Sequence, residues 1–137
     1  MYRHKWIDGS EIELPVGKAV CVGRNYAEHA RELGNEVPAE PLLFIKPATA
    51  LCDLNKPLLV PQDRGAVHHE IEIVVLIGAP LANASADEAH AAIVGYGVGL
   101  DLTLRDLQDA LKEKSQPWEK AKAVSYTHLT LPTNREV

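Results

Sequence analysis

Two glutamates interrupt the most apolar segment of the chain and limit what that segment can become. Residues 68–78 read HHEIEIVVLIG and are rich in β-branched residues, so they predict a buried strand. Side chains alternate between the faces of a strand, which places Glu70 and Glu72 on one face with Val74 and Leu76. A carboxylate on a face that continues into a core is costly unless it is paired or metal-bound. The pattern fits a divalent cation site and an amphipathic edge strand equally well, and a third oxygen ligand would favour the metal site.

A third acid follows a later apolar segment. Residues 96–102 read YGVGLDL and predict a strand whose glycines allow close backbone approach, with Asp101 near its end. Three carboxylates on core strands would make an all-oxygen site, which suits Mg²⁺, Mn²⁺ or Ca²⁺ better than zinc. Because Mg²⁺ keeps positions for water or substrate oxygens, such a site would face a chelating organic anion. We predict Glu70, Glu72 and Asp101 as the ligands.

Composition limits the chain to one globular domain with a small-molecule ligand. It has 137 residues, of which 46% are hydrophobic, and a formal net charge of -5. Its Lys and Arg residues are scattered, so we expect no nucleic acid and no anionic membrane surface as a partner. No apolar stretch approaches the roughly 20 residues that span a bilayer, and no signal-peptide core is present, so we expect a cytoplasmic protein. Cys21 and Cys52 lack C-x-x-C spacing and are expected to be reduced.

Local signals predict strands and helices in mixed order along the chain. The first half of the chain predicts a hairpin turning at Asp8-Gly9, a strand at residues 18–22, a helix at residues 26–33 capped by Asn25, and strands at residues 42–46 and 57–61. The second half predicts a helix that runs from a capping box at Ser85 and Glu88 through Val94. It also predicts a helix that is capped by Thr103 or its neighbour and carries Leu104, Leu107 and Leu111 on one face.

Several polar side chains could act on a substrate. His29 and Glu32 lie three apart on a predicted helix, so Glu32 could orient the imidazole as a general base, although such pairs are also common on solvated helix faces. The cations that could bind a substrate carboxylate, or could equally be ordinary surface charges, are Arg24, Lys46, Arg105 and Lys122.

Five segments of the chain form a set of motifs in a fixed order. They are residues 20–29 (VCVGRNYAEH), 41–47 (PLLFIKP), 68–72 (HHEIE), 100–106 (LDLTLRD) and 117–122 (PWEKAK). Together they resemble the fumarylacetoacetate hydrolase family, in particular its small bacterial members and its acylpyruvase and oxaloacetate-processing branch. The resemblance extends from residue 1 to about residue 123.

The resemblance implies an α/β (α+β) fold, a mixed β-sandwich roll with short flanking helices, and a homodimer. It implies a divalent metal ion, usually Mg²⁺, held by the same three carboxylates. It also implies that His29 and Glu32 form a dyad that activates water, and that Lys122, Arg105 and Gln108 contact the substrate or its developing enolate. Arg24 completes the predicted substrate-binding residues.

The activity expected from the resemblance is Mg²⁺-dependent hydrolysis of a carbon–carbon bond in acylpyruvate-like or fumarylacetoacetate-like 2,4-diketo acids. In that reaction His29 would deprotonate the attacking water. One alternative is an oxaloacetate decarboxylase or keto–enol tautomerase. Such an enzyme needs the same metal-stabilised enolate but no attacking water. Another alternative is an inactive metal-binding fragment.

The end of the chain departs from the family pattern. Family members continue further, with more of the sheet and a loop that closes the substrate pocket. We therefore expect residues 1–123 to be the N-terminal part of a catalytic domain that is incomplete at its C-terminus. Residues 124–137 (VSYTHLTLPTNREV) have no helical period and resemble translated sequencing-adapter sequence, so we expect a non-native tail.

Overall fold

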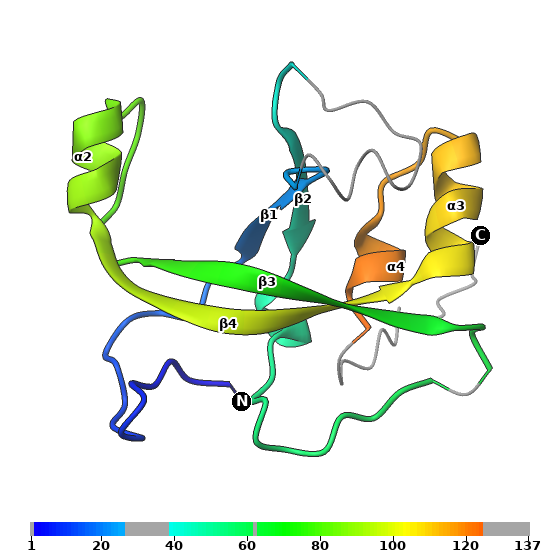
Figure 1. Cartoon of the computed structure of the whole chain (residues 1–137), viewed down its shortest axis with the longest axis horizontal. Coiled ribbons are helices and arrows are strands. Elements are labelled where there is room, and N and C mark those ends of the chain that lie inside the picture. The colour runs from blue at the N-terminus through cyan, green and yellow to red at the C-terminus, as the bar shows by residue number, and fades with distance from the viewer. Residues whose placement is uncertain (1, 27–38, 62, 125–137) are drawn as a thin grey trace, which may run out of the picture.

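The structure, a computed structural model, describes residues 2–26, 39–61 and 63–124 (Figure 1). Strands and helices are mixed along these residues, as the predicted α+β class requires. The elements are the strands β1 (Ala19–Gly23), β2 (Leu42–Lys46), β3 (Val67–Ile77) and β4 (Ile93–Leu104), the 3-10 helix η1 (Ala48–Ala50), and the helices α2 (Ala86–Ala91), α3 (Arg105–Glu113) and α4 (Glu119–Lys122).

The described strands form two antiparallel pairs. β1 pairs with β2, and Ala19 lies opposite Lys46. β3 and β4 form a much longer ribbon, in which Glu70 lies opposite Asp101. Figure 1 shows this ribbon crossing the molecule, with α2 at one end and α3 and α4 at the other. The end that carries α3 and α4 is also the end that carries the acids.

The buried core lies at the α3 end of the ribbon. Its members are Leu102, Leu104, Leu111, Ala121 and Val124, and Leu58, Val67, Leu107 and Trp118 pack against them. Helix α3 contributes Leu107 and Leu111 of the predicted apolar face, whereas Leu104 is the last residue of β4 and not part of the helix. This core fixes β4, α3 and α4 relative to one another, which matters because all three carry predicted site residues.

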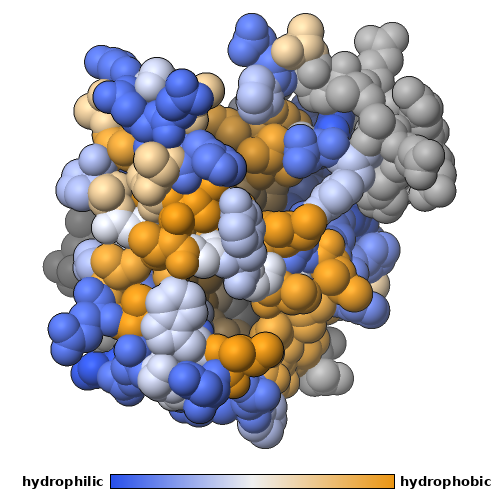
Figure 2. All heavy atoms as spheres, turned by 60° about the vertical axis from the view of Figure 1, so that its left-hand side comes forward, coloured by the Kyte–Doolittle hydropathy of each residue, from blue (hydrophilic) through white to orange (hydrophobic). Residues whose placement is uncertain are grey.

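Away from this core the ribbon is exposed, contrary to the prediction of a buried strand. Val74, on the face of the acids, is 46% exposed. The opposite face carries a cross-strand row of exposed apolar side chains, namely Ile71, Ile73, Val75, Tyr96, Val98 and Leu100. Each side chain of this row is at least 36% exposed. Figure 2 shows apolar side chains gathered on the molecular surface.

Two turn and cap predictions are confirmed. Gly9 adopts φ +88°, and the Trp6 amide donates to the Ser10 carbonyl at 2.9 Å, although pairing beyond the turn is limited to an isolated bridge. The capping box is complete, because Ser85 Oγ accepts from the Glu88 amide at 3.3 Å and Glu88 accepts from the Ser85 amide at 2.8 Å.

Two element predictions need correction, and the predicted start of α3 is confirmed. Residues 57–61 are not in a strand, and the prolines at both ends of the segment lack the N–H donors that strand pairing needs. The helix predicted to reach Val94 ends at Ala91, because Ile93 pairs with Ile77 and begins β4. Helix α3 has Leu104, the neighbour of Thr103, at its N-cap and no side-chain cap. The helix predicted at residues 26–33 lies outside the described residues, apart from Tyr26. No helix in the described ranges is long and apolar enough to cross a membrane.

Candidate functional site

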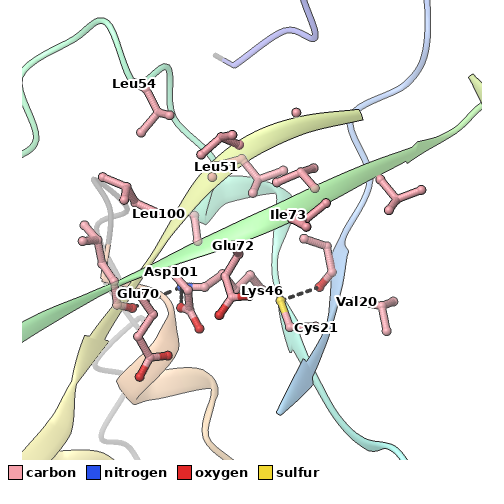
Figure 3. Close-up of a pocket in the computed structure, with 18 of the residues that line it drawn as sticks. Val20, Cys21, Lys46, Leu51, Leu54, Glu70, Glu72, Ile73, Leu100 and Asp101 are labelled. Carbon is pink, nitrogen blue, oxygen red and sulfur yellow. Dashed lines mark hydrogen bonds and ion pairs between the residues drawn. The ribbon is translucent and has the colours of Figure 1, made fainter. Parts of the chain in front are cut away.

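The β3–β4 register brings the three predicted acids together. Glu70 and Asp101 are directly opposite each other, so they share a face of the ribbon, and Glu72 lies two residues further along β3 on that same face. Figure 3 shows the three carboxylates pointing to one side, beside Lys46 and Cys21. The sequence alone predicted the shared face of Glu70 and Glu72, and pairing with β4 adds Asp101.

Asp101 is a buried carboxylate between two lysines. Its residue is 6% exposed. One oxygen, Oδ2, accepts a hydrogen bond from Lys122 Nζ at 2.6 Å. The other, Oδ1, lies 2.6 Å from Lys46 Nζ as an ion pair but accepts no hydrogen bond. The structure therefore leaves one buried carboxylate oxygen with unused acceptor capacity.

Lys122 links Asp101 to the rest of the site. The residue is 3% exposed, and its Nζ also donates to Thr103 Oγ1 at 2.8 Å and to Glu70 Oε2 at 3.1 Å. The same Nζ lies 4.8 Å from the centre of the Phe44 ring, a favourable cation–π distance. The described contacts use all three ammonium donors, so this side chain is held in one place.

Glu70 is the point where α3 contributes to the site. Arg105, the first residue of α3, pairs with Glu70 through Nη2, and its Nη1 donates to Gln108 Oε1 at 2.6 Å. Burial raises the pKa of Glu70, but Lys122 and Arg105 outweigh that effect, so its pKa lies below the ordinary glutamate value. Three predicted site residues, Lys122, Arg105 and Gln108, thus meet around Glu70.

Glu72 is in the opposite electrostatic situation. Burial raises its pKa first, the negative charges of Asp101 and Glu70 raise it further, and a hydrogen bond from Tyr26 offsets only part of this. Among the described residues no cation forms an ion pair with Glu72. A carboxylate that faces two others without its own counter-ion is a position where an added cation would be stabilising.

A divalent cation fits the donor set but not the present spacing. Within the described ranges, no three acidic, His or Cys side chains are grouped closely enough to hold a metal ion. The Lys122 ammonium lies between Glu70 and Asp101 and compensates their charges. The free acceptor capacity of Asp101 Oδ1, the unpaired charge of Glu72 and the all-oxygen chemistry together suit a hard cation such as Mg²⁺ or Mn²⁺.

One broad cavity unites the described site residues. Its lining includes Arg24, Glu70, Glu72, Asp101, Arg105, Gln108 and Lys122. Arg24 follows β1 in the left-handed region at φ 56°, a conformation that is uncommon for a residue other than glycine. His29 and Glu32 lie outside the described residues, so their predicted dyad stays a prediction.

Two polar residues at the site were not among the predicted site residues. Thr103 is fully buried and accepts from Lys122. It was predicted as a possible helix cap, but β4 extends to Leu104, so strand alternation places Thr103 on the face of Asp101. Lys46 was considered only as a possible substrate-carboxylate ligand. A lysine that ends the apolar strand LLFIK is the sequence signal that points to it.

Comparison with known proteins identifies the family. The family model for the C-terminal part of fumarylacetoacetate (FAA) hydrolase matches residues 18–130. The chain is 58% identical over 123 residues to an oxaloacetate tautomerase of Escherichia coli (strain K12), which covers 90% of this chain and 56% of that protein. The chain therefore spans about half the length of this relative. The family match ends inside residues 124–137, and the boundary at residue 123 stays a prediction.

Solved structures agree with this assignment. A fumarylacetoacetate hydrolase family protein from Yersinia pestis CO92 superposes with a TM-score of 0.87 at 57% identity, over 90% of this chain and 57% of that one. A fumarylpyruvate hydrolase from Pseudomonas aeruginosa, solved with Mn²⁺ and pyruvate, gives a TM-score of 0.74 at 42% identity, over 85% of this chain and 52% of that one. The predicted fold class is confirmed, and the chain belongs to the fumarylacetoacetate hydrolase family.

Proposed function

We propose that this protein is an enzyme that interconverts the keto and enol forms of oxaloacetate. The observation that carries the proposal is the buried Lys122 ammonium, held against Asp101, Thr103 and Glu70 on the wall of the cavity. A fixed cation in a poorly solvated site stabilises an oxyanion as it forms. The name of the Escherichia coli relative, an oxaloacetate tautomerase, supports the same substrate.

The reaction needs a proton transfer and no attacking water. A proton leaves C3, its electron pair forms the C2–C3 double bond, and the C2 carbonyl oxygen becomes an enolate that takes up a proton. Lys122 would donate to that oxygen. Of its three acceptors Glu70 is the most distant, at 3.1 Å, and Glu70 is also held by Arg105. If Lys122 gives up this hydrogen bond and donates to the substrate oxygen instead, Glu70 therefore remains paired with Arg105. His29, outside the described residues, is the predicted base for the C3 proton.

The two carboxylates of oxaloacetate call for cations, and we assign them to Arg105 and Arg24. Arg105 presents a planar guanidinium that Gln108 orients through the 2.6 Å hydrogen bond. Glu70, Glu72 and Asp101 would hold Mg²⁺ or Mn²⁺, with Ca²⁺ as the remaining candidate. When bound, such an ion polarises the 2-oxo carbonyl and stabilises enolate charge. The Mn²⁺ in the Pseudomonas aeruginosa relative supports this assignment.

Hydrolysis of an acylpyruvate is the second candidate. The specific observation in its favour is the similarity to a fumarylpyruvate hydrolase, whose structure holds pyruvate. Hydrolysis would use the same cations to stabilise the departing enolpyruvate, and it would additionally require His29 and Glu32 to activate water. Decarboxylation of oxaloacetate is a third possible reaction, because it also requires that the enolate charge is stabilised.

A chimaera separates these candidates. Residues 1–123 would replace the matching segment of the Escherichia coli relative, which places the site of this chain in a protein of the relative's length. Enol formation is followed by ultraviolet absorbance, and fumarylpyruvate cleavage and pyruvate release are assayed in parallel, each with and without a chelator. We expect metal-dependent tautomerisation that Lys122→Met abolishes. Cleavage of fumarylpyruvate with no effect on oxaloacetate enolisation would instead establish the hydrolase. Absence of all three activities would favour a metal-binding fragment.

We further propose a homodimer that uses the exposed apolar face of the ribbon. The row of Ile71, Ile73 and Val75 on β3 and their partners on β4 forms one continuous surface, the arrangement that marks interaction sites. Light scattering of the purified chain, over a range of concentrations, tests this proposal. A cytoplasmic location stays a prediction.

A further inference from the structure

Lys46, the last residue of β2, is a buried cation with three partners. The residue is 8% exposed. Its Nζ lies 2.6 Å from Asp101 Oδ1, donates to the Leu102 carbonyl at 3.2 Å, and also donates to the Lys122 carbonyl. Two of the three N–H donors of this ammonium go to the two carbonyls, and its charge is paired with the Asp101 carboxylate. Lys46 therefore has little capacity to bind a substrate carboxylate, the role considered for it from sequence.

The partners of Lys46 belong to two different elements of the site. Asp101 and Leu102 are on β4, whereas Lys122 is the last residue of α4. β2 belongs to the other strand pair and has no strand pairing with the β3–β4 ribbon. Lys46 thus ties the β1–β2 pair to both elements at the point where Asp101 and Lys122 meet.

Phe44 reinforces this connection. Phe44 and Lys46 stand two apart on β2, so they face the same way, and the Phe44 ring lies 4.8 Å from Lys122 Nζ. Lys46 holds the Lys122 backbone while Phe44 contacts its ammonium. One face of β2 therefore acts on both ends of the same residue.

We propose that Lys46 is a positioning residue, which holds the Asp101 carboxylate and the Lys122 ammonium at the separation that the site requires. The reason why the site requires this separation rests on the proposed function. The contacts of Lys46 with Asp101 and Lys122 are the same whatever the substrate is. Lys46 acts through Asp101 and Lys122 and does not touch the reacting atoms.

The first test observes Lys122 directly in the 137-residue chain labelled with ¹⁵N-lysine. The Lys122 ammonium signal is assigned by its loss in Lys122→Met, and its proton exchange rate is measured. We expect Lys46→Met to speed this exchange roughly fivefold or more, the factor that corresponds to losing one hydrogen bond. Unchanged exchange in Lys46→Met, or no protected Lys122 ammonium signal in the parent chain, would overturn the proposal.

Two controls exclude a merely structural effect. Lys5→Met removes a lysine whose Nζ is paired with Asp53 at 3.6 Å rather than with an acid of the site, and it should leave the Lys122 signal unchanged. Leu111→Ala weakens the core beneath α3 without touching the acids. An equal increase of Lys122 exchange in Leu111→Ala would mean that Lys46 only stabilises the fold, and the proposal would fail.

Lys46→Arg provides a second variant, which also covers the case that Lys46→Met does not fold. Arginine keeps the positive charge, but its planar guanidinium cannot place one nitrogen beside two carbonyls and the Asp101 carboxylate at the same time. We expect faster Lys122 exchange and Mn²⁺ binding weakened about tenfold or more, as for residues that orient metal ligands. Parent-like values for both would overturn the proposal. If the parent chain binds no Mn²⁺, the metal site of the proposed function fails, and the Lys122 signal alone decides the role of Lys46.

Discussion

Replacing Lys122 with methionine is expected to destabilise the chain by about 3 kcal/mol. Methionine keeps the apolar stem but removes an ammonium that lies 2.6 Å from Asp101 and 3.1 Å from Glu70. Breaking a buried ion pair costs roughly 3–5 kcal/mol, because the partner charge stays in a poorly solvated place. The lower end of that range applies here, since Lys46 still contacts Asp101 and Arg105 still contacts Glu70.

Urea unfolding measures this loss. Trp118 packs against the buried core, so its fluorescence reports the state of the site region. With a urea slope of roughly 1–3 kcal/mol per M, a change of about 3 kcal/mol lowers the midpoint by about 1–3 M. Lys5→Met is the matched control, because its ion pair with Asp53 is partly exposed and should contribute at most about 1 kcal/mol. A Lys122→Met midpoint no lower than that of Lys5→Met would refute the electrostatic reasoning.

A double-mutant cycle tests the same reasoning more directly. Asp101→Asn removes the charge that Lys122→Met leaves behind, so the double variant should be more stable than the sum of the two single losses predicts. Residues in direct contact typically couple by about 0.5–3 kcal/mol. Additive losses would show that Asp101 and Lys122 do not interact as the 2.6 Å distance implies.

Three further predictions concern other parts of the molecule. Burial and the acidic neighbours of Glu72 raise its pKa above the ordinary value of 4.5. The stability that protonated Glu72 contributes is therefore present below pH 4.5 and is lost as the pH rises through the raised pKa. Without metal, Glu72→Gln should therefore have a higher urea midpoint than the parent at neutral pH but not at low pH, and a parent-like midpoint at neutral pH would contradict this. Ile73→Lys places a charge on the apolar face of the ribbon and should dissociate the proposed dimer, as measured by light scattering; an unchanged mass would exclude that face. Gly65→Ala should lower the thermal midpoint, because Gly65 has φ +79° and an added Cβ would lie 2.6 Å from Asp106 Oδ2, whereas Gly97→Ala meets nothing within 4 Å and should have a smaller effect.

Local patterns were reliable where they depended on neighbouring residues. The capping box at Ser85 and the turn at Gly9 involve residues close in sequence, and both form as predicted. Strand alternation likewise placed Glu70 and Glu72 on one face. The same kind of local reasoning was wrong at Ile93. The sequence pattern predicted a helix there, but Ile93 pairs with Ile77 across the ribbon and lies in a strand.

By itself, the sequence determined the residue types of the candidate site and the shared face of Glu70 and Glu72, because alternation follows from strand geometry. Only the tertiary structure decided that Lys46 and Lys122 converge on Asp101. These two lysines are 76 residues apart, and no local rule relates β2 to α4. The Phe44 ring of β2 lies 5.9 Å from the ring of Trp118, the N-cap residue of α4, and Trp118 in turn packs against the buried core. This packing places both lysines beside Asp101, where no local sequence pattern would have put them.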